Sequence, residues 1–182
     1  SLSQQMPLER STFQNFSLDF YADAPDASGH APKEVAAANL KICQKFAAEF
    51  PQGKNLLFLG NPGLGKTHLS MAIANEVLKK GHTVVYGSAQ NIIDGCLSER
   101  FSYSGSTAYI DGCLDCDLLI LDDLGTELQN AGSLSVIYNI INSRLLSSRS
   151  TIISTNLTLK ELETRYEPRL CSRIVGGYTL RA

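Results

Sequence analysis

Short runs of apolar residues alternate along the chain with longer segments in which apolar residues recur every three or four positions. Uninterrupted apolar runs of this length are typical of strands buried in a parallel sheet, and the longer spacing is typical of amphipathic helices. The pattern predicts strands at 56–59, 83–86, 117–123, 151–156 and 178–180. It predicts helices at 33–50, 66–80, 88–97, 133–145, 158–166 and 169–175, with a further short helix that ends near Cys113.

Strands that alternate with helices predict an α/β fold of three layers, in which helices flank a parallel five-stranded sheet. A length of 182 residues fits one such domain, which we expect at 33–182. Residues 1–32 are mixed and polar and read as an irregular N-terminal arm. Phe13 and Phe16 in this arm either anchor it to the core or pack near the base of a bound nucleotide.

The charge balance limits the possible partners. Sixteen basic and 18 acidic side chains give a formal charge of −2, which argues against a histone-like binder and leaves only a local patch for contact with nucleic acid. No apolar run approaches the length of a membrane span, and the N-terminus lacks the order of a signal peptide. We therefore expect a cytoplasmic protein without a membrane partner.

Five cysteines, at 43, 96, 113, 116 and 171, are an odd number in a chain without a secretory signal. Thiols are then expected instead of a disulfide framework. Cys113 and Cys116 have the spacing of a metal or redox pair, but no second pair of cysteines or histidines completes a zinc site. We interpret them as ordinary thiols.

A glycine-rich loop follows the first predicted strand and leads into a helix, which is the arrangement of a phosphate-binding P-loop. Glycines let the backbone N–H groups converge on phosphate oxygens at the positive end of the helix. Lys66 is expected to reach the β- and γ-phosphates, and the Thr67 hydroxyl to hold Mg²⁺. The predicted nucleotide-binding residues are Gly60, Asn61, Pro62, Gly63, Leu64, Gly65, Lys66, Thr67 and His68.

Two later strands end in polar residues. Asp122 and Asp123 close one strand and Asn156 closes the next, and the carboxyl ends of parallel strands share one edge of the sheet. Asp122 is expected to hold Mg²⁺, directly or through water, and Asp123 to orient or deprotonate the attacking water. Asn156 can donate to the γ-phosphate and accept from water. The alternatives are acids that simply end a strand and a turn-forming asparagine.

Three arginines, at 165, 169 and 173, recur every four residues late in the chain. Arginine suits a finger that reaches the phosphates of a bound nucleotide, because its planar charge offers several donors. The alternative is a surface ion pair.

The motifs GNPGLGKTH at 60–68, LLILDD at 118–123, STN at 154–156 and RLCSRI at 169–174 resemble the AAA+ ATPases of the DnaC, DnaI and IstB group. The resemblance implies an AAA+ core in which the first two motifs are Walker A and Walker B. Asn156 then matches sensor I. Arg173 falls where the family's arginine finger reaches the ATP of a neighbouring subunit, with Arg169 as the alternative.

The resemblance also implies a function. It predicts an ATPase that serves as a DNA replication helicase loader. Hydrolysis is expected to be slow, because Asp123 stands where AAA+ proteins usually have Glu. The replicative helicase is expected to bind through an N-terminal domain outside this chain, and the family's extreme C-terminus is also expected to lie outside it. The connection from Gln90 to Cys113 is expected to contact single-stranded DNA, with Arg100, Phe101 and Tyr103 suited to base stacking; a solvated loop is the alternative.

Three other functions remain open on the sequence. An IstB-like helper ATPase for transposition shares all four motifs. A P-loop kinase for small molecules would need an acceptor pocket, but it would not need the acid pair followed by a strand that ends in Asn156. A module that binds ATP to control assembly would scarcely hydrolyse it.

Overall fold

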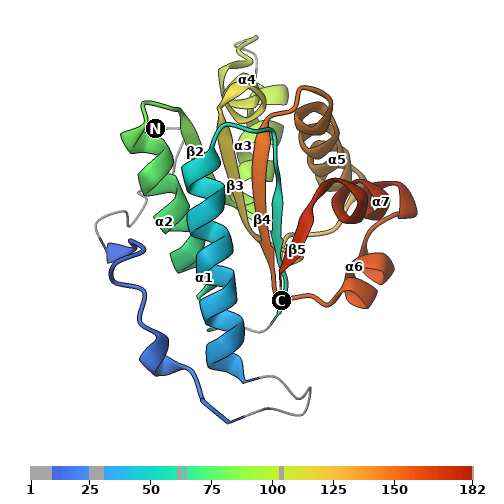
Figure 1. Cartoon of the computed structure of the whole chain (residues 1–182). Helices are drawn as coiled ribbons and strands as arrows, with labels where there is room; N and C mark the ends of the chain where they lie inside the picture. Colours follow the sequence, from blue (N-terminus) through green and yellow to red (C-terminus); the bar gives the residue numbers. More distant parts are fainter. Residues whose placement is uncertain (1–9, 25–30, 61–62, 64, 103–104, 182) are drawn as a thin grey trace.

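The computed structural model describes residues 10–24, 31–60, 63, 65–102 and 105–181. Its centre is a sheet of five strands in the order β2-β3-β4-β1-β5 (Figure 1). Every pair of neighbouring strands is parallel, so the predicted parallel five-stranded sheet is confirmed. The strands are β1 (Leu56–Phe58), β2 (Val84–Ser88), β3 (Leu118–Leu124), β4 (Ser150–Thr155) and β5 (Thr179–Arg181).

Helices cover both faces of this sheet, which gives three layers (Figure 1). One face carries α1 (Pro32–Glu49) and α2 (Lys66–Lys79). The helices packed on the other face are α3 (Ala89–Arg100), α4 (Ala108–Asp115), α5 (Ala131–Leu146), α6 (Leu159–Arg165) and α7 (Pro168–Gly177).

The alternation of side chains along each strand divides the core into two halves. Leu118 and Ile120 of β3 pack with α1 and α2. Leu119 and Leu121, which point the other way, pack with α3, α5 and α7. Both halves are apolar, which is why β3 reads as a continuous hydrophobic run and not as an alternating one.

Most helices begin within a residue of their predicted starts, but several boundaries were wrong. Ser88 caps α3 and Thr158 caps α6, at the two residues where these helices were predicted to begin. Helix α5, however, begins at Ala131, because Asn130 and Ser133 bond each other's backbone in a capping box. Helix α3 also runs to Arg100, through residues that were predicted to form a loop; polar residues on an exposed helix end cannot be told from a loop by polarity alone.

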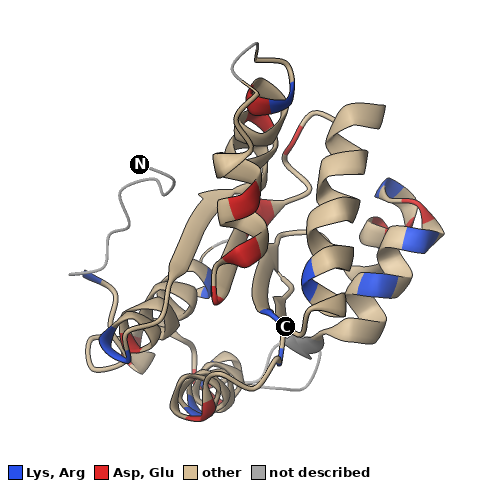
Figure 2. Ribbon diagram, turned by 90° about the horizontal axis from the view of Figure 1, so that it is seen from above, with Lys and Arg blue, Asp and Glu red and all other residues tan. Residues whose placement is uncertain are grey.

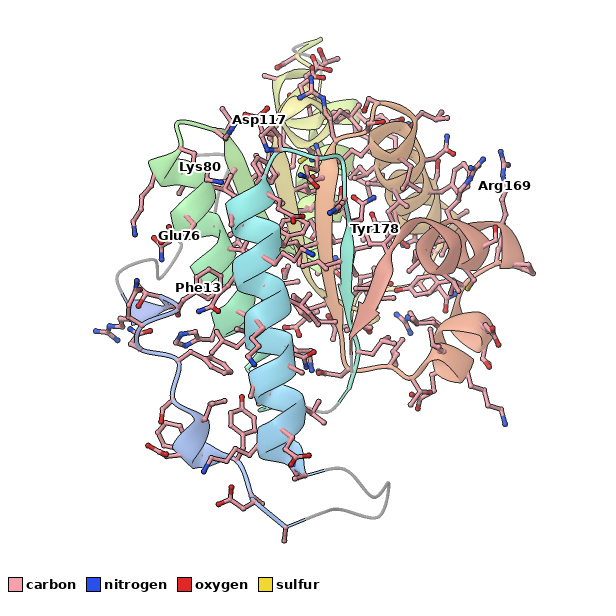
Figure 3. All side chains as sticks on the ribbon, viewed as in Figure 1. Phe13, Glu76, Lys80, Asp117, Arg169 and Tyr178 are labelled. Atoms are coloured by element: carbon pink, nitrogen blue, oxygen red, sulfur yellow. The ribbon has the colours of Figure 1, made fainter. Side chains whose placement is uncertain are left out.

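Helices α1 and α2 are joined by hydrogen bonds. The Lys80 ammonium group, at the end of α2, donates to the backbone oxygens of Ala47 at 2.6 Å and Ala48 at 2.7 Å (Figure 3). These carbonyls belong to the last turn of α1, where a helix has acceptors without intrahelical partners. One lysine therefore satisfies the end of α1 and holds α2 beside it.

The described part of the arm runs along α1 and α2 (Figure 1). It contains a short 3-10 helix, Leu18–Phe20, and joins α1 through the ion pair of Asp23 with Lys33 at 3.1 Å. Basic and acidic positions are interspersed around the described chain (Figure 2), in keeping with its small net charge. None of the described helices is both long enough and apolar enough to cross a bilayer. The division into an arm at 1–32 and a domain at 33–182 stays a prediction.

Candidate functional site

The candidate site lies at the edge of the sheet where β1, β3 and β4 end. The loop after β1 leads into α2, whose N-cap, Gly65, has φ of 73°. Gly63 has φ of 87°, and a Cβ there would meet no atom within 4 Å. The left-handed backbone, and not crowding, therefore calls for glycine at position 63. The predicted ligands Asn61, Pro62 and Leu64 lie outside the described residues.

Lys66 points from the start of α2 into a pocket of 350 Å³. Its ammonium group donates to the backbone oxygen of Gly60 at 2.5 Å and to Oδ1 of Asn156 at 2.9 Å. Burial lowers the pKa of Lys66, whereas the charges of Asp123 and Asp122 act in the opposite direction. The residues that line the pocket are Gly63, Gly65, Lys66, Thr67, His68, Asp123 and Asn156.

Asp122 lies behind this pocket and is only 4% exposed. Its Oδ2 accepts hydrogen bonds from the Thr67 hydroxyl and from the Tyr86 hydroxyl, each at 3.1 Å. Its Oδ1 accepts from the Ser154 hydroxyl and, at 3.2 Å, from the backbone N–H of Asp123. The structure thus brings together Thr67 and Asp122, the two residues predicted to hold the metal.

Asp123 leaves the regular strand. Its φ of 54° is unusual for a residue with a side chain, and the pairing of β3 with β4 is irregular between Leu121 and Leu124. The irregularity places Asp123 in the pocket, one residue after the buried Asp122. Burial and repulsion from Asp122 raise the pKa of Asp123, and the charge of Lys66 opposes them.

These side chains fit a nucleotide with Mg²⁺. The Thr67 hydroxyl and the Asp122 carboxylate are hard oxygen ligands, which magnesium prefers. In the part of the chain that the structure describes, no three residues of the types His, Cys, Asp and Glu gather into a metal cluster. Magnesium normally has only a few protein ligands, because phosphate oxygens and water usually complete its coordination shell.

His68 connects the site to the arm. Its Nε2 lies 2.9 Å from the backbone oxygen of Thr12, and the Phe16 ring meets the imidazole edge-on at 5.3 Å. A Cβ on Gly65 would lie 2.7 Å from both the Phe16 ring and the Tyr21 hydroxyl. Phe16 therefore packs against the start of α2, while Phe13 is partly buried against the α1–α2 half of the core (Figure 3).

The three candidate arginines do not line this pocket. Arg165 donates to the backbone oxygen of the buried Glu127 at 2.5 Å. The Arg169 guanidinium lies 4.3 Å from the centre of the Tyr138 ring, at the outer edge of the molecule (Figure 3). Arg173 is exposed on α7. An arginine finger from this helix would have to act on another copy of the chain.

The structure also shows what the sequence did not reveal. Tyr86 was not singled out, although it contacts Asp122 as directly as Thr67 does. The available signal was weak, because Tyr86 is only the last residue of a predicted strand whose neighbour in the sheet the sequence does not indicate. All five cysteines are buried as thiols, and the backbone oxygens of Cys113 and Cys116 accept hydrogen bonds from Arg144.

Comparison with known proteins places this geometry in a family. The family model described as IstB-like ATP binding protein matches residues 28–174. The replicative helicase loader DnaC of Escherichia coli K12 is 29% identical over 144 residues, which are 78% of this chain and 58% of that protein. An uncharacterized protein of the same strain, YdaV, is 30% identical over 68% of this chain and 50% of its own length. The chain thus spans little more than half of these relatives.

Solved structures agree with the sequence relatives. A crystal structure of the DnaC helicase loader has a TM-score of 0.70 and 28% identity, and the match covers 93% of this chain and 97% of that one. AMPPCP-bound DnaA from Aquifex aeolicus has a TM-score of 0.72 at 23% identity, over 94% of this chain and 50% of that one, and shares the fold. The resemblance to the DnaC, DnaI and IstB group is confirmed, and the chain belongs to the family of IstB-like ATP-binding proteins.

Proposed function

We propose that this chain is the ATP-hydrolysing AAA+ domain of a DNA replication helicase loader. The observation that carries the ATP-hydrolysing part of the proposal is a single pocket with an amine, a hydroxyl, a carboxylate and an amide on its walls, backed by the contact of Thr67 with Asp122. The loader part is supported by the similarity to DnaC. These are the groups that phosphoryl transfer requires: positive charge, a metal ligand, a group that orients water and a donor to the γ-phosphate.

Each residue has one task in this mechanism. Lys66 exchanges its contacts with Gly60 and Asn156 for phosphate oxygens, and the backbone N–H groups at the start of α2 bind the same phosphates. Thr67 and Asp122 would hold Mg²⁺, which neutralises charge on the β- and γ-phosphates. Asp123 orients the attacking water and accepts its proton, and Asn156 donates to the γ-phosphate.

Two variants test the site. Lys66→Ala should abolish ATP binding, because the pocket loses its cation. Asp123→Asn should bind ATP as the unchanged protein does, with turnover reduced on the order of 100-fold or more, because an amide cannot accept the proton. Binding is measured by titration calorimetry, and turnover by phosphate release.

Matched controls are Lys41→Ala and Asp94→Asn, which remove the same groups from exposed positions on α1 and α3. Neither should change binding or turnover. Unreduced turnover in Asp123→Asn would remove Asp123 from the mechanism, and full binding in Lys66→Ala would contradict the proposed nucleotide site.

The protein partner distinguishes a helicase loader from the second candidate, a transposition helper ATPase. The E. coli relative is named a replicative helicase loader, whereas the family model carries the IstB name and favours a transposition helper as the second candidate. Co-purification of the full-length protein with a replicative helicase supports the first reading, and co-purification with a transposase supports the second. The contact between Lys66 and Asn156 supports both over a small-molecule kinase, which does not require an asparagine there.

We also propose contacts that involve further surfaces. Phe101 is 77% exposed at the end of α3, beside Arg100, and would stack on the bases of single-stranded DNA. Tyr103 lies outside the described residues. Self-association would bring α7 of one copy to the nucleotide of another, and the protein partner would be a replicative helicase.

A further inference from the structure

The Tyr86 hydroxyl donates to Oδ2 of Asp122 at 3.1 Å, the same oxygen that accepts from Thr67. Tyr86 belongs to β2, where it pairs with Ile120 of β3, two residues before Asp122. Side chains two residues apart lie on one face of a strand, so the phenol reaches the carboxylate diagonally across the two strands. The tyrosine itself packs against the α1–α2 half of the core, which fixes its direction.

The other oxygen of Asp122 is held from the opposite side. Ser154 of β4 donates its hydroxyl to Oδ1, and the Asp123 backbone N–H donates to it at 3.2 Å. Two carboxylate oxygens offer about four acceptor positions, and here Tyr86, Thr67, Ser154 and Asp123 supply four donors. Neighbouring strands on both sides thereby set the plane of the carboxylate.

We propose that Tyr86 is a positioning residue for the magnesium ion of the bound nucleotide, acting through Asp122. This inference rests on the proposed function. The terminal torsion of an aspartate is intrinsically broad, so a carboxylate that lost the phenol would sample orientations that turn Oδ2 away from Thr67. Partners of metal ligands typically contribute 10- to 100-fold in metal affinity by holding the ligand in place.

The test measures how much magnesium strengthens nucleotide binding, without reference to turnover. The dissociation constant of fluorescently labelled ADP is measured with Mg²⁺ and with EDTA, for the unchanged protein and for Tyr86→Phe. We expect the Mg²⁺-dependent gain in affinity to fall on the order of 10-fold in Tyr86→Phe. The affinity in EDTA should stay the same, because the phosphate loop and Lys66 are intact.

The matched control is Tyr109→Phe, which removes a phenol hydroxyl from α4, where it lies 3.5 Å from the backbone oxygen of Asn91. It should leave both constants unchanged. A Tyr86→Phe protein that keeps the full gain from Mg²⁺ overturns the inference. So does a variant that loses affinity equally in EDTA, because the hydroxyl would then support the whole pocket and not the carboxylate.

A double-mutant cycle separates positioning from a general structural effect. In an Asp122→Asn background, Tyr86→Phe should cause no further loss of the Mg²⁺-dependent gain, because the group that it positions is already changed. If the losses of Mg²⁺-dependent gain in the two single variants add up in the double variant, Tyr86 does not act through Asp122. If the unchanged protein binds no ADP in either condition, the proposed function falls and this inference falls with it. If the unchanged protein shows the Mg²⁺-dependent gain in ADP affinity and Tyr86→Phe shows the same gain, only the inference about Tyr86 is overturned.

Discussion

Arg144 is the largest fully buried side chain of the protein's described part, and its neighbours are backbone carbonyls instead of an acid. Its guanidinium donates to the backbone oxygens of Cys113, Leu114 and Cys116 at 2.9–3.0 Å. It also donates to the Ser150 backbone oxygen at 2.7 Å and to the Thr151 hydroxyl at 2.9 Å. One side chain of α5 therefore satisfies the end of α4 and the start of β4.

Replacement of this residue should be costly even when the charge is kept. Arg144→Lys replaces a planar fork of five donors by a single ammonium group, so several buried carbonyls lose their partner. We expect a loss on the order of 3 kcal/mol in the free energy of unfolding, measured by urea denaturation. Arg100→Lys, at an exposed position, should change it by about 0.5 kcal/mol or less. Equal urea midpoints for the two variants would contradict this account of Arg144.

At the residue scale, the sequence indicated which residues lie together at the pocket, but it did not indicate their contacts with distant strands. Lys66 and Thr67 follow from a glycine-rich loop before a helix, and Asp122 from a carboxylate at the end of an apolar strand. The contact of Tyr86 with Asp122 depends on how two strands pair, and the left-handed φ of Asp123 depends on an irregularity in that pairing. Neither the Tyr86 contact nor the backbone conformation of Asp123 can be predicted from the neighbouring residues in the sequence.

Strands β2 and β3 are joined at their starts by Asp117 (Figure 3). Its carboxylate accepts from the backbone N–H of Thr83 at 2.8 Å and from the Thr83 hydroxyl at 3.0 Å. These hydrogen bonds, and the nearby His82, lower the pKa of Asp117, although partial burial acts in the opposite direction. The lowered pKa means that the folded protein favours the charged carboxylate.

This contact should make stability depend on pH. Because the pKa is lower in the folded state, the stabilisation is present above the ordinary aspartate value of about 3.9 and is lost as the pH falls toward the folded value. Asp117→Asn should therefore lower the urea midpoint near neutral pH, and the difference from the unchanged protein should shrink as the pH falls below the ordinary aspartate pKa of about 3.9. Asp94→Asn, which alters an exposed carboxylate, should show a much smaller difference. A difference of the same size at both pH values would contradict the role of charge at Asp117.

Element types followed from the spacing of apolar residues, but element ends did not always do so. Helix α5 begins two residues early because Asn130 caps it. Helix α3 continues past its predicted end, and the Glu99 carboxylate accepts from the backbone N–H groups of Tyr109 and Ile110, both at 2.9 Å, at the start of α4. Ends of this kind depend on side chains that reach a neighbouring segment, which periodicity does not record.

On the scale of the whole molecule, the candidate nucleotide pocket and the two exposed arginines of α7, Arg169 and Arg173, belong to different regions of one copy. If Arg173 acts on a neighbouring subunit, Arg173→Ala and Lys66→Ala should each be inactive alone. A mixture of the two should recover part of the ATPase activity, because one intact composite site can form from the nucleotide site of the first and the arginine of the second. Phosphate release is measured under conditions in which the chains associate.

Mixing Lys66→Ala with Asp123→Asn provides the control. Both changes lie in the pocket of one chain, so a mixture in which Arg173 is intact everywhere still contains no complete pocket and should stay inactive. No recovery with Arg173→Ala in a sample shown to associate would contradict its role in trans. The same mixture made with Arg169→Ala tests the alternative arginine, which is stacked on Tyr138.

The order of the strands was the part of the architecture that the sequence could not supply. Apolar runs separated by helices predict parallel strands, but they do not say that β1 lies between β4 and β5. That order depends on contacts between residues far apart in the chain. The shared edge at the strand ends needs only the parallel direction, so the site residues could be grouped before the order was known.

The packing of the arm on α2 determines where a shortened form of the protein should begin. The family model starts at residue 28, whereas Phe16, Tyr21 and the Thr12 carbonyl already lie against Gly65 and His68. A version trimmed to the family boundary would keep all four sequence motifs and yet expose the side of Gly65 and His68 that the arm covers to solvent. Measurements on such a version would describe a nucleotide site with an altered border, and the shorter boundary is therefore the wrong one to choose.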